Sequence, residues 1–313
     1  MSKIPLLVLA GPTAVGKSEL AMCLARKLNC AIISADSAQV YRYMDIGTAK
    51  PTEAERQEIK HYLIDLVNPD QYFSAADYQK AARQAINEQW SAGKIPFMVG
   101  GTGLYIRAVI SSYAFGRQGA SGILRKQLEK EADQYGLNRL FEKLQKLDPA
   151  TADIIHPNDR RRIIRALEVY TLEGRPISDQ VKKTNRDNSP YHTLFYCLNC
   201  ERDLLYERIN GRVNRMLEAG FLHEVKSLYL QGYDLSAPGM QILGYRQLLE
   251  YLGGERSWED TVEEIKKQTR NLAKRQLTWF RGEKDVNWLN RTGKEELCEE
   301  AEIIYNRVKE LLP

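Results

Sequence analysis

Residues 11–18 read Gly11-Pro12-Thr13-Ala14-Val15-Gly16-Lys17-Ser18 and match the pattern G-x-x-x-x-G-K-[ST] of a phosphate-binding loop, or P-loop. An apolar run at residues 4–10 precedes the loop, and residues 18–28 follow it with helical spacing of apolar side chains. The glycines let backbone N–H groups curve around phosphate oxygens, while the next helix directs the positive end of its dipole at the anion. Lys17 is placed to neutralise phosphate charge, and the Ser18 hydroxyl to bind Mg²⁺. The pattern therefore predicts a site for a diphosphate or triphosphate.

Two further apolar runs indicate how the first strand is extended into a sheet. Residues 31–34 end near Asp36, and residues 95–99 end in Gly100-Gly101-Thr102-Gly103. The other segments before residue 116 alternate between strand and helix patterns, at 62–66, 75–90 and 104–110. This alternation is typical of a parallel α/β sheet, in which the carboxyl ends of the strands face the ligand crevice. Asp36 and Thr102 are therefore expected beside the phosphates, with Asp36 as metal partner or general base, unless it is an ordinary turn or N-cap aspartate.

The pattern changes in the middle of the chain. From about residue 121 to 171 the sequence is charged, helical and poor in strand signals, and residues 193–198 again alternate apolar and aromatic side chains. We predict a P-loop NTPase-like α/β core with a parallel sheet, made of residues 1–116 and 193–313, and a helical insertion domain at 117–192. The last third is expected to form helices at 204–218, 221–230 and 258–280 and a short strand at 286–289.

Composition narrows the class of protein. The chain has 313 residues and a net charge of +4, and residues 117–192 hold 15 Lys and Arg against 11 Asp and Glu. This segment carries the entire positive excess, which favours a polyanionic partner there. No apolar run approaches the roughly 20 residues of a membrane span, and residues 4–10 are too short for a signal peptide, so we expect a soluble, cytoplasmic protein. The five cysteines do not indicate a disulfide scaffold, and Cys197 and Cys200 lack the second pair of a zinc site.

Several further motifs resemble those of the bacterial tRNA isopentenyltransferase family, the tRNA dimethylallyltransferases. The most specific is DSAQVY at 36–41 followed by DIGTAKP at 45–51. The others are GGTGLY at 100–105, DRRRIIRALEV at 159–169, GMQILGYR at 239–246 and TRNLAKRQLTWFR at 269–281. The resemblance spans nearly the whole chain. It implies transfer of a dimethylallyl group from dimethylallyl diphosphate to N6 of the adenosine at position 37 of tRNA, beside the anticodon, with Mg²⁺ as cofactor and release of diphosphate.

The resemblance also implies roles for single residues. Asp36 would take a proton from the adenine amine, which is a poor nucleophile, and Thr102 would lie near the reacting diphosphate. Arg208 and Arg212 share one helix face, and we assign the diphosphate clamp to Arg212 in preference to Arg208, although a solvated charged face is the alternative for either. The predicted catalytic residues are Asp36, Thr102, Lys17 and Arg212. The predicted diphosphate-binding residues are Gly11, Pro12, Thr13, Ala14, Val15, Gly16, Lys17, Ser18, Arg208 and Arg212.

A larger set is expected to bind the anticodon stem-loop of tRNA. Gln39 is placed to read an adenine edge, and the arginines at 160, 161, 162 and 165 form a cluster suited to phosphates or stacked loop bases, or else an ordinary charged helix face. The predicted tRNA-binding residues are Asp36, Ser37, Ala38, Gln39, Thr102, Arg125, Arg161, Arg162, Ile163, Ile164, Arg165, Gln241, Gly244, Tyr245, Arg246, Arg270 and Lys274. We expect the protein to act as a monomer, without a membrane partner.

Three other functions stay open on the residues alone. A related adenylate isopentenyltransferase modifies free nucleotides and needs no RNA surface. A P-loop kinase of a small metabolite would use ATP at residues 11–18, with Asp36 deprotonating a hydroxyl. A noncatalytic RNA-binding protein with a structural nucleotide leaves the combination of Asp36 and Thr102 unexplained. The basic segment 117–192 and the motifs of the last third favour the tRNA-modifying enzyme.

Overall fold

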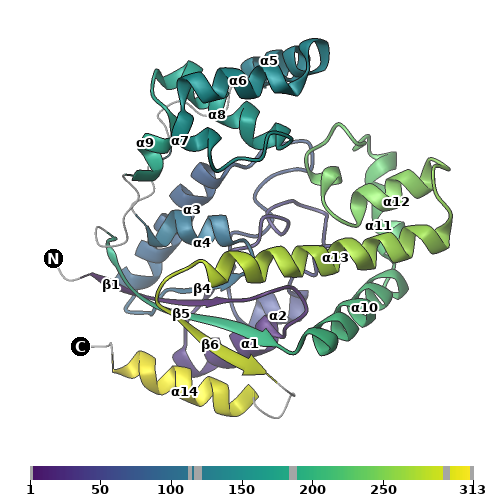
Figure 1. The fold of residues 1–313 in the computed structure, drawn as a ribbon. Helices are drawn as coiled ribbons and strands as arrows, with labels where there is room; N and C mark the ends of the chain where they lie inside the picture. Colours follow the sequence, from purple (N-terminus) through teal and green to yellow (C-terminus); the bar gives the residue numbers. More distant parts are fainter. Residues whose placement is uncertain (1–2, 112–114, 116–121, 183–188, 292–296, 311–313) are drawn as a thin grey trace. The chain divides into compact units, whose positions relative to one another are not determined.

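The computed structural model describes residues 3–111, 115, 122–182, 189–291 and 297–310. Contacts divide the chain into two compact units, one made of Met1–Val109 and Pro190–Pro313 and the other of Ile110–Ser189. The chain therefore leaves the first unit, forms the second and returns to the first (Figure 1). The sequence had placed this interruption at 117–192, a few residues later at both ends.

A six-stranded sheet forms the centre of the first unit. Its strands lie in the order β3-β2-β4-β1-β5-β6, and each pair is parallel. Their bounds are β1 Ile4–Ala10, β2 Ile32–Ser34, β3 His61–Tyr62, β4 Phe97–Gly100, β5 Tyr191–Cys200 and β6 Val286–Arg291. The predicted parallel α/β fold class is confirmed. Strand β1 lies between β4 and β5, so the centre of the sheet joins the two separate parts of the chain that form this unit.

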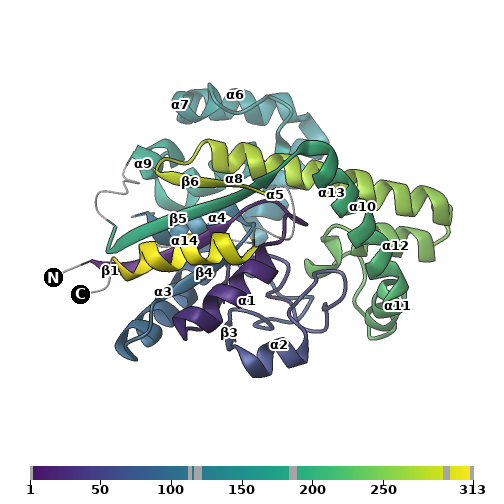
Figure 2. The same cartoon turned by 90° about the horizontal axis from the view of Figure 1, so that it is seen from below.

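Helices cover both faces of the sheet. Helices α1 and α14 lie on one face, and α4 and α13 lie on the other (Figures 1 and 2). The helices of this part of the chain are α1 Lys17–Leu28, α2 Glu53–Glu58, α3 Ala75–Ser91, α4 Gly103–Ile110, α10 Arg202–Glu218, α11 Phe221–Leu230, α12 Tyr245–Leu252, α13 Trp258–Arg281 and α14 Leu297–Lys309, with a short 3₁₀ helix at Gly239–Gln241. Because both faces are covered, the strands are apolar on both sides, as the continuous run in β1 indicates.

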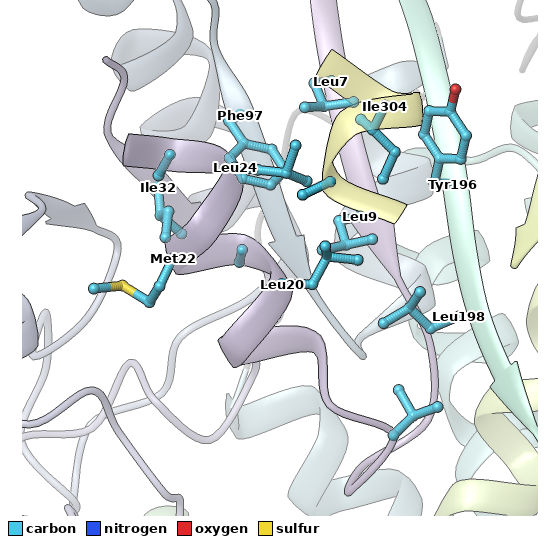
Figure 3. Close-up of a cluster of buried hydrophobic side chains, with 14 of the residues drawn as sticks. Leu7, Leu9, Leu20, Met22, Leu24, Ile32, Phe97, Tyr196, Leu198 and Ile304 are labelled. Atoms are coloured by element: carbon cyan, nitrogen blue, oxygen red, sulfur yellow. The ribbon is translucent and has the colours of Figure 1, made fainter. Parts of the chain in front are cut away.

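One hydrophobic cluster fixes the element that follows the P-loop. Leu7 and Leu9 of β1 pack with Leu20 and Leu24 of α1 and Ile304 of α14, and all five are buried (Figure 3). Full burial of such side chains contributes about 1.5–3 kcal/mol each. The cluster holds α1 against β1 and so sets the position of residues 11–16, which connect them.

The strand predicted at 62–66 is shorter than expected. Only His61–Tyr62 pairs with β2, because Leu63 and Asp65 have positive φ angles of 64° and 55°, which end the extended conformation. The predicted elements also omit α2, α12 and α14.

The second unit is helical in the part that the structure describes. Its helices are α5 Gly122–Tyr135, α6 Leu137–Leu147, α7 Pro149–Ala152, α8 Arg160–Glu173 and α9 Ile177–Lys182. They share a core that includes Leu128, Leu140, Leu144, Ile163 and Leu167. This agrees with the helical pattern read at 121–171.

The described residues also bear on membrane insertion and on disulfide bonding. Within them, no helix combines the length and apolar character needed to cross a bilayer. The described cysteines Cys23, Cys30, Cys197 and Cys200 are free thiols.

Candidate active site

Three strand ends bring the predicted catalytic loops together at one edge of the sheet. β1 runs into the P-loop, β2 into Asp36 and β4 into Thr102, and β4 lies between the other two strands. Gly100 permits this approach, because a Cβ there would lie 2.1 Å from the Ala35 carbonyl oxygen. Thr102 N donates to the same oxygen at 3.0 Å. The predicted grouping of these sequence-distant residues is therefore present in the fold.

The Thr102 side chain fastens the loop that carries Asp36. Thr102 Oγ1 accepts a hydrogen bond from Ser37 N at 3.0 Å and donates one to Ser37 Oγ at 3.3 Å. Asp36 is half-buried, and its Oδ1 accepts from Ala38 N at 2.8 Å. These bonds orient the carboxylate relative to the end of β4.

The side chain of Lys17 folds back and binds the backbone at the start of the P-loop. Helix α1 begins at Lys17, directly after Gly16, whose φ of 98° lies in the left-handed region. Lys17 Nζ donates to Gly11 O at 3.0 Å and to Pro12 O at 2.6 Å. Ser18 follows in the first turn of the helix and is exposed. The loop therefore surrounds an ammonium group, next to an accessible hydroxyl.

Lys17, Asp36 and Arg212 act on one another electrostatically. The pKa of Lys17 is lowered to about 8, chiefly by burial and then by the Arg212 guanidinium, whereas Asp36 opposes the shift. Burial also lowers the pKa of Arg212, again against the attraction of Asp36. Burial raises the pKa of the Cys200 thiol, and the guanidinium of Arg208, one turn earlier on α10, opposes this rise. The charge of Arg212 therefore acts on both Lys17 and Asp36, and two cations near one carboxylate favour an anionic ligand.

Two residues that the motifs did not single out hold the P-loop from outside. Gln276 Oε1 of α13 accepts from Thr13 N at 2.8 Å, and its Nε2 donates to Gly101 O at 3.1 Å. Arg291, the last residue of β6, donates hydrogen bonds to the carbonyl oxygens of Val15 and Gly16 in the loop. Gln276 lies within the motif at 269–281, but nothing in the pattern distinguishes it from a surface glutamine, and Arg291 lies outside every motif.

The carboxamide of Gln39 is used inside the protein. Its Oε1 accepts from Ser34 Oγ at 2.8 Å, and its Nε2 donates to Ala49 O at 3.2 Å and to Thr48 O at 3.4 Å. Both polar atoms of this side chain therefore join the end of β2 to the DIGTAKP segment. An adenine edge could reach this amide only if one of these bonds were exchanged, so the assignment of Gln39 as an adenine contact stays a prediction.

The DIGTAKP segment is also anchored by a carboxylate from α11. Glu224 Oε2 accepts from Asp45 N at 2.8 Å and Ile46 N at 2.7 Å, and Oε1 accepts from Gly47 N at 3.2 Å. Tyr245 donates its hydroxyl to Oε1 at 2.6 Å and is fully buried. The Tyr245 side chain thus faces the interior, contrary to its predicted place among the tRNA contacts.

The remaining predicted contacts of this unit differ in exposure. Gly244 is buried, and a Cβ there would lie 2.8 Å from the Phe221 ring. Gln241 and Arg246 are exposed, and they line a cavity of about 460 Å³ together with Gln268 and Arg275 of α13. Residues of the GMQILGYR motif and of the motif at 269–281 therefore line the same cavity.

Two more predicted contacts lie on α13. Arg270 donates to Asn210 Oδ1 at 2.7 Å, and Lys274 is exposed. Lys274 is therefore the more accessible of the two side chains.

In the second unit, the arginine-rich motif combines surface and core residues. Arg161 and Arg162 are exposed in the first turn of α8. Ile163 and Ile164 are only 0% and 4% exposed and belong to the core of the unit. The two isoleucine side chains therefore do not face a ligand, which corrects their assignment as tRNA contacts through side chains.

Ion pairs engage the other predicted arginines of this unit, and the exposed Arg162 also lies 3.4 Å from Oδ2 of Asp159. Arg125 and Arg165 both donate to Oε2 of the buried Glu168, at 2.8 Å and 2.7 Å. Arg160 pairs with Asp133 at 2.6 Å. Arg125 and Arg165 thus neutralise a buried charge that would otherwise destabilise the unit.

Comparisons with known proteins agree over nearly the whole chain. Residues 39–283 match the sequence model of the family described as IPP transferase. The tRNA dimethylallyltransferase of Pelotomaculum thermopropionicum is 48% identical over 287 residues, which are 92% of this chain and 91% of the relative. That of Lachnoclostridium phytofermentans is 46% identical over 97% of this chain and 96% of its own.

Solved structures give the same result. The full-length tRNA isopentenylpyrophosphate transferase of Bacillus halodurans has a TM-score of 0.72 and 41% identity, covering 98% of both chains. A eukaryotic dimethylallyltransferase acting on tRNA has a TM-score of 0.84 at 29% identity, covering 99% of this chain and 80% of its own.

Proposed function

The chain belongs to the IPP transferase family, and from that premise we propose that it transfers a dimethylallyl group from dimethylallyl diphosphate to N6 of the adenosine at position 37 of tRNA, beside the anticodon. The observation that carries the proposal is the convergence of the P-loop, Asp36, Thr102 and Arg212 at one edge of the sheet. On this proposal the P-loop holds a leaving group, so carbon is attacked and no phosphoryl group moves.

The proposed reaction makes one bond and breaks one. N6 of the adenine attacks C1 of the dimethylallyl group, and the allylic C–O bond breaks with its electron pair leaving on diphosphate. Negative charge then grows where Lys17, Arg212 and the N–H groups of the P-loop lie, so these groups stabilise the transition state. Asp36 accepts the proton that the amine loses, and Thr102 keeps the Asp36 loop beside the diphosphate.

Mg²⁺ fits the donors that this edge of the sheet offers. The exposed Ser18 hydroxyl in the first turn of α1 and the Asp36 carboxylate are hard oxygen ligands of the kind that this ion binds. We assign Ser18 to the ion and keep Asp36 as the proton acceptor. When bound, Mg²⁺ supplies neutralisation of the diphosphate charge.

The exposed cationic residues of both units are assigned to tRNA. Arg161 and Arg162 in the second unit and Arg246 and Lys274 in the first are accessible and suited to phosphates of the anticodon stem-loop. The target base has to leave its stack to reach the diphosphate ester. We place the reaction in the cytoplasm and assign it to a monomer.

The test offers the purified protein labelled dimethylallyl diphosphate and Mg²⁺ with one of four acceptors. These are unmodified tRNA, the same transcript with guanosine at position 37, AMP, or none. Label in the first transcript alone is the expected result. Label entering AMP instead would assign the chain to adenylate modification. No transfer to any acceptor, together with turnover of ATP in a parallel reaction that contains ATP, would assign it to the kinases.

A further inference from the structure

The buried ion pair of Arg291 and Glu300 lies next to the P-loop, on the side of its Val15 and Gly16 carbonyl groups. Arg291 at the end of β6 is 2% exposed, and its Nε lies 3.1 Å from Oε2 of Glu300 on α14, which is 6% exposed. Removing two charges from water is costly, so a buried pair is weak support for stability alone. Both residues also lie beyond the segment 39–283 that matches the family model.

The guanidinium holds two carbonyl groups of the P-loop. Arg291 Nη1 donates to Val15 O and to Gly16 O, each at 3.2 Å. A peptide bond is planar and trans, so its C=O and N–H point in opposite directions. The peptide of Val15 O carries the N–H of Gly16, and that of Gly16 O carries the N–H of Lys17. Because both carbonyl oxygens point toward Arg291, both N–H groups point away from Arg291 and into the loop.

The loop and the guanidinium are fitted to each other at Gly16. Its φ of 98° favours glycine, and a Cβ at this position would lie 2.0 Å from Arg291 Nη1. The guanidinium thus occupies the space that any larger residue at position 16 would need. Its charge also polarises the two peptide groups, which makes their N–H groups stronger donors to an anion.

We propose that Arg291, paired with the carboxylate of Glu300, is a positioning residue that orients the N–H groups of Gly16 and Lys17 for the diphosphate of the prenyl donor. The identity of the donor rests on the proposed function, whereas the orientation of the loop for a diphosphate does not. Arg291 acts through the backbone of residues 15–17 and does not touch the substrate.

The experiment measures the dissociation constant of inorganic diphosphate by calorimetry, together with kcat and the KM values of both substrates. Arg291→Ala is expected to weaken diphosphate binding about 10- to 100-fold and to raise the KM of dimethylallyl diphosphate similarly, with the KM of tRNA unchanged. Guanidinium chloride below its denaturing concentration should restore part of this loss, and Arg291→Lys should fall between the two proteins. Arg307→Ala removes an exposed arginine from α14 and is the matched control.

Two outcomes would overturn the inference. One is a folded Arg291→Ala variant that binds diphosphate within about twofold of the parent. The other is an equal loss of diphosphate and tRNA binding that guanidinium does not restore, since a general loss of structure predicts that result. If Arg291→Ala does not fold, the dissociation constant of diphosphate and the KM values are measured for Arg291→Lys and Glu300→Gln instead. The same two outcomes would then overturn the inference. A parent protein that binds diphosphate but modifies no tRNA would refute the proposed function and leave this test intact.

Discussion

Glu224→Gln removes one of the two acceptor oxygens that anchor the DIGTAKP segment. In the parent protein Oε2 accepts from Asp45 N and Ile46 N, and Oε1 accepts from Gly47 N and the Tyr245 hydroxyl. The oxygen of a glutamine replaces one of these acceptors. Its NH₂ group then faces the other pair of donors, which lose their acceptor.

The expected magnitude follows from the burial of these donors. Hydrogen bonds to a charged group contribute about 1.5–3 kcal/mol each, and a buried donor without an acceptor costs about 1–3 kcal/mol. Asp45 N lies near the surface and can turn to water, so the loss comes mainly from one buried donor and from weakening of the retained bonds. We expect the free energy of unfolding to fall by about 2–4 kcal/mol.

The same change should reach the chemistry through Gln39. That side chain joins Thr48 and Ala49 to Ser34, two residues before Asp36, so a loosened segment frees the loop that carries the proposed base. We expect kcat to fall while the KM of dimethylallyl diphosphate stays unchanged, because the P-loop contacts are intact. Urea unfolding and steady-state kinetics measure both effects, with Glu207→Gln on the exposed side of α10 as control. Equal stability and kcat in the two variants would refute the reasoning.

Three further predictions concern the proposed site and the RNA surface. Asp36→Ala should keep tRNA affinity but reduce transfer by about 10²- to 10⁴-fold in a single-turnover assay, and near-normal turnover would exclude it as the base. Because the pKa of Lys17 is lowered to about 8, dimethylallyl diphosphate without tRNA should bind about tenfold more weakly per pH unit above that value, as the neutral amine must first take up a proton. Calorimetry between about pH 7 and 9.5 checks this, and Lys17→Arg should show no such dependence. Arg161→Ala combined with Arg162→Ala should reduce the slope of log affinity for tRNA against log salt by about 1–2, and an unchanged slope would mean that these side chains do not contact RNA.

The sequence predicted those features that depend on local patterns. The P-loop between a strand and a helix is a local signal, and the rule on strand ends was enough to expect Asp36 and Thr102 together. The helical character of the second unit followed in the same way from spacing and charge.

Features that depend on distant contacts were not predicted. Glu224 and Asp45 are 179 residues apart in the chain, so no local pattern connects them. A motif also does not show which of its members face inward: Gln39 and Tyr245 belong to motifs expected to bind tRNA, yet their polar atoms are used within the protein. Arg291 contacts the P-loop from β6, far along the chain, so no local pattern indicated its role.

The position of Arg291 affects the order in which the protein becomes functional during its synthesis. A ribosome makes the chain from the N-terminus, and the whole P-loop motif is present after residue 18. Its strand, however, pairs Ile4 with Tyr191, and the support beneath the loop comes from residues 291 and 300. Non-local pairing of this kind forms late, after the intervening chain exists. A nascent chain that already carries the motif and the arginine-rich helix therefore lacks the contacts of the Arg291 and Glu300 pair with the P-loop, and the proposed diphosphate site is complete only after β6 and the start of α14 have emerged.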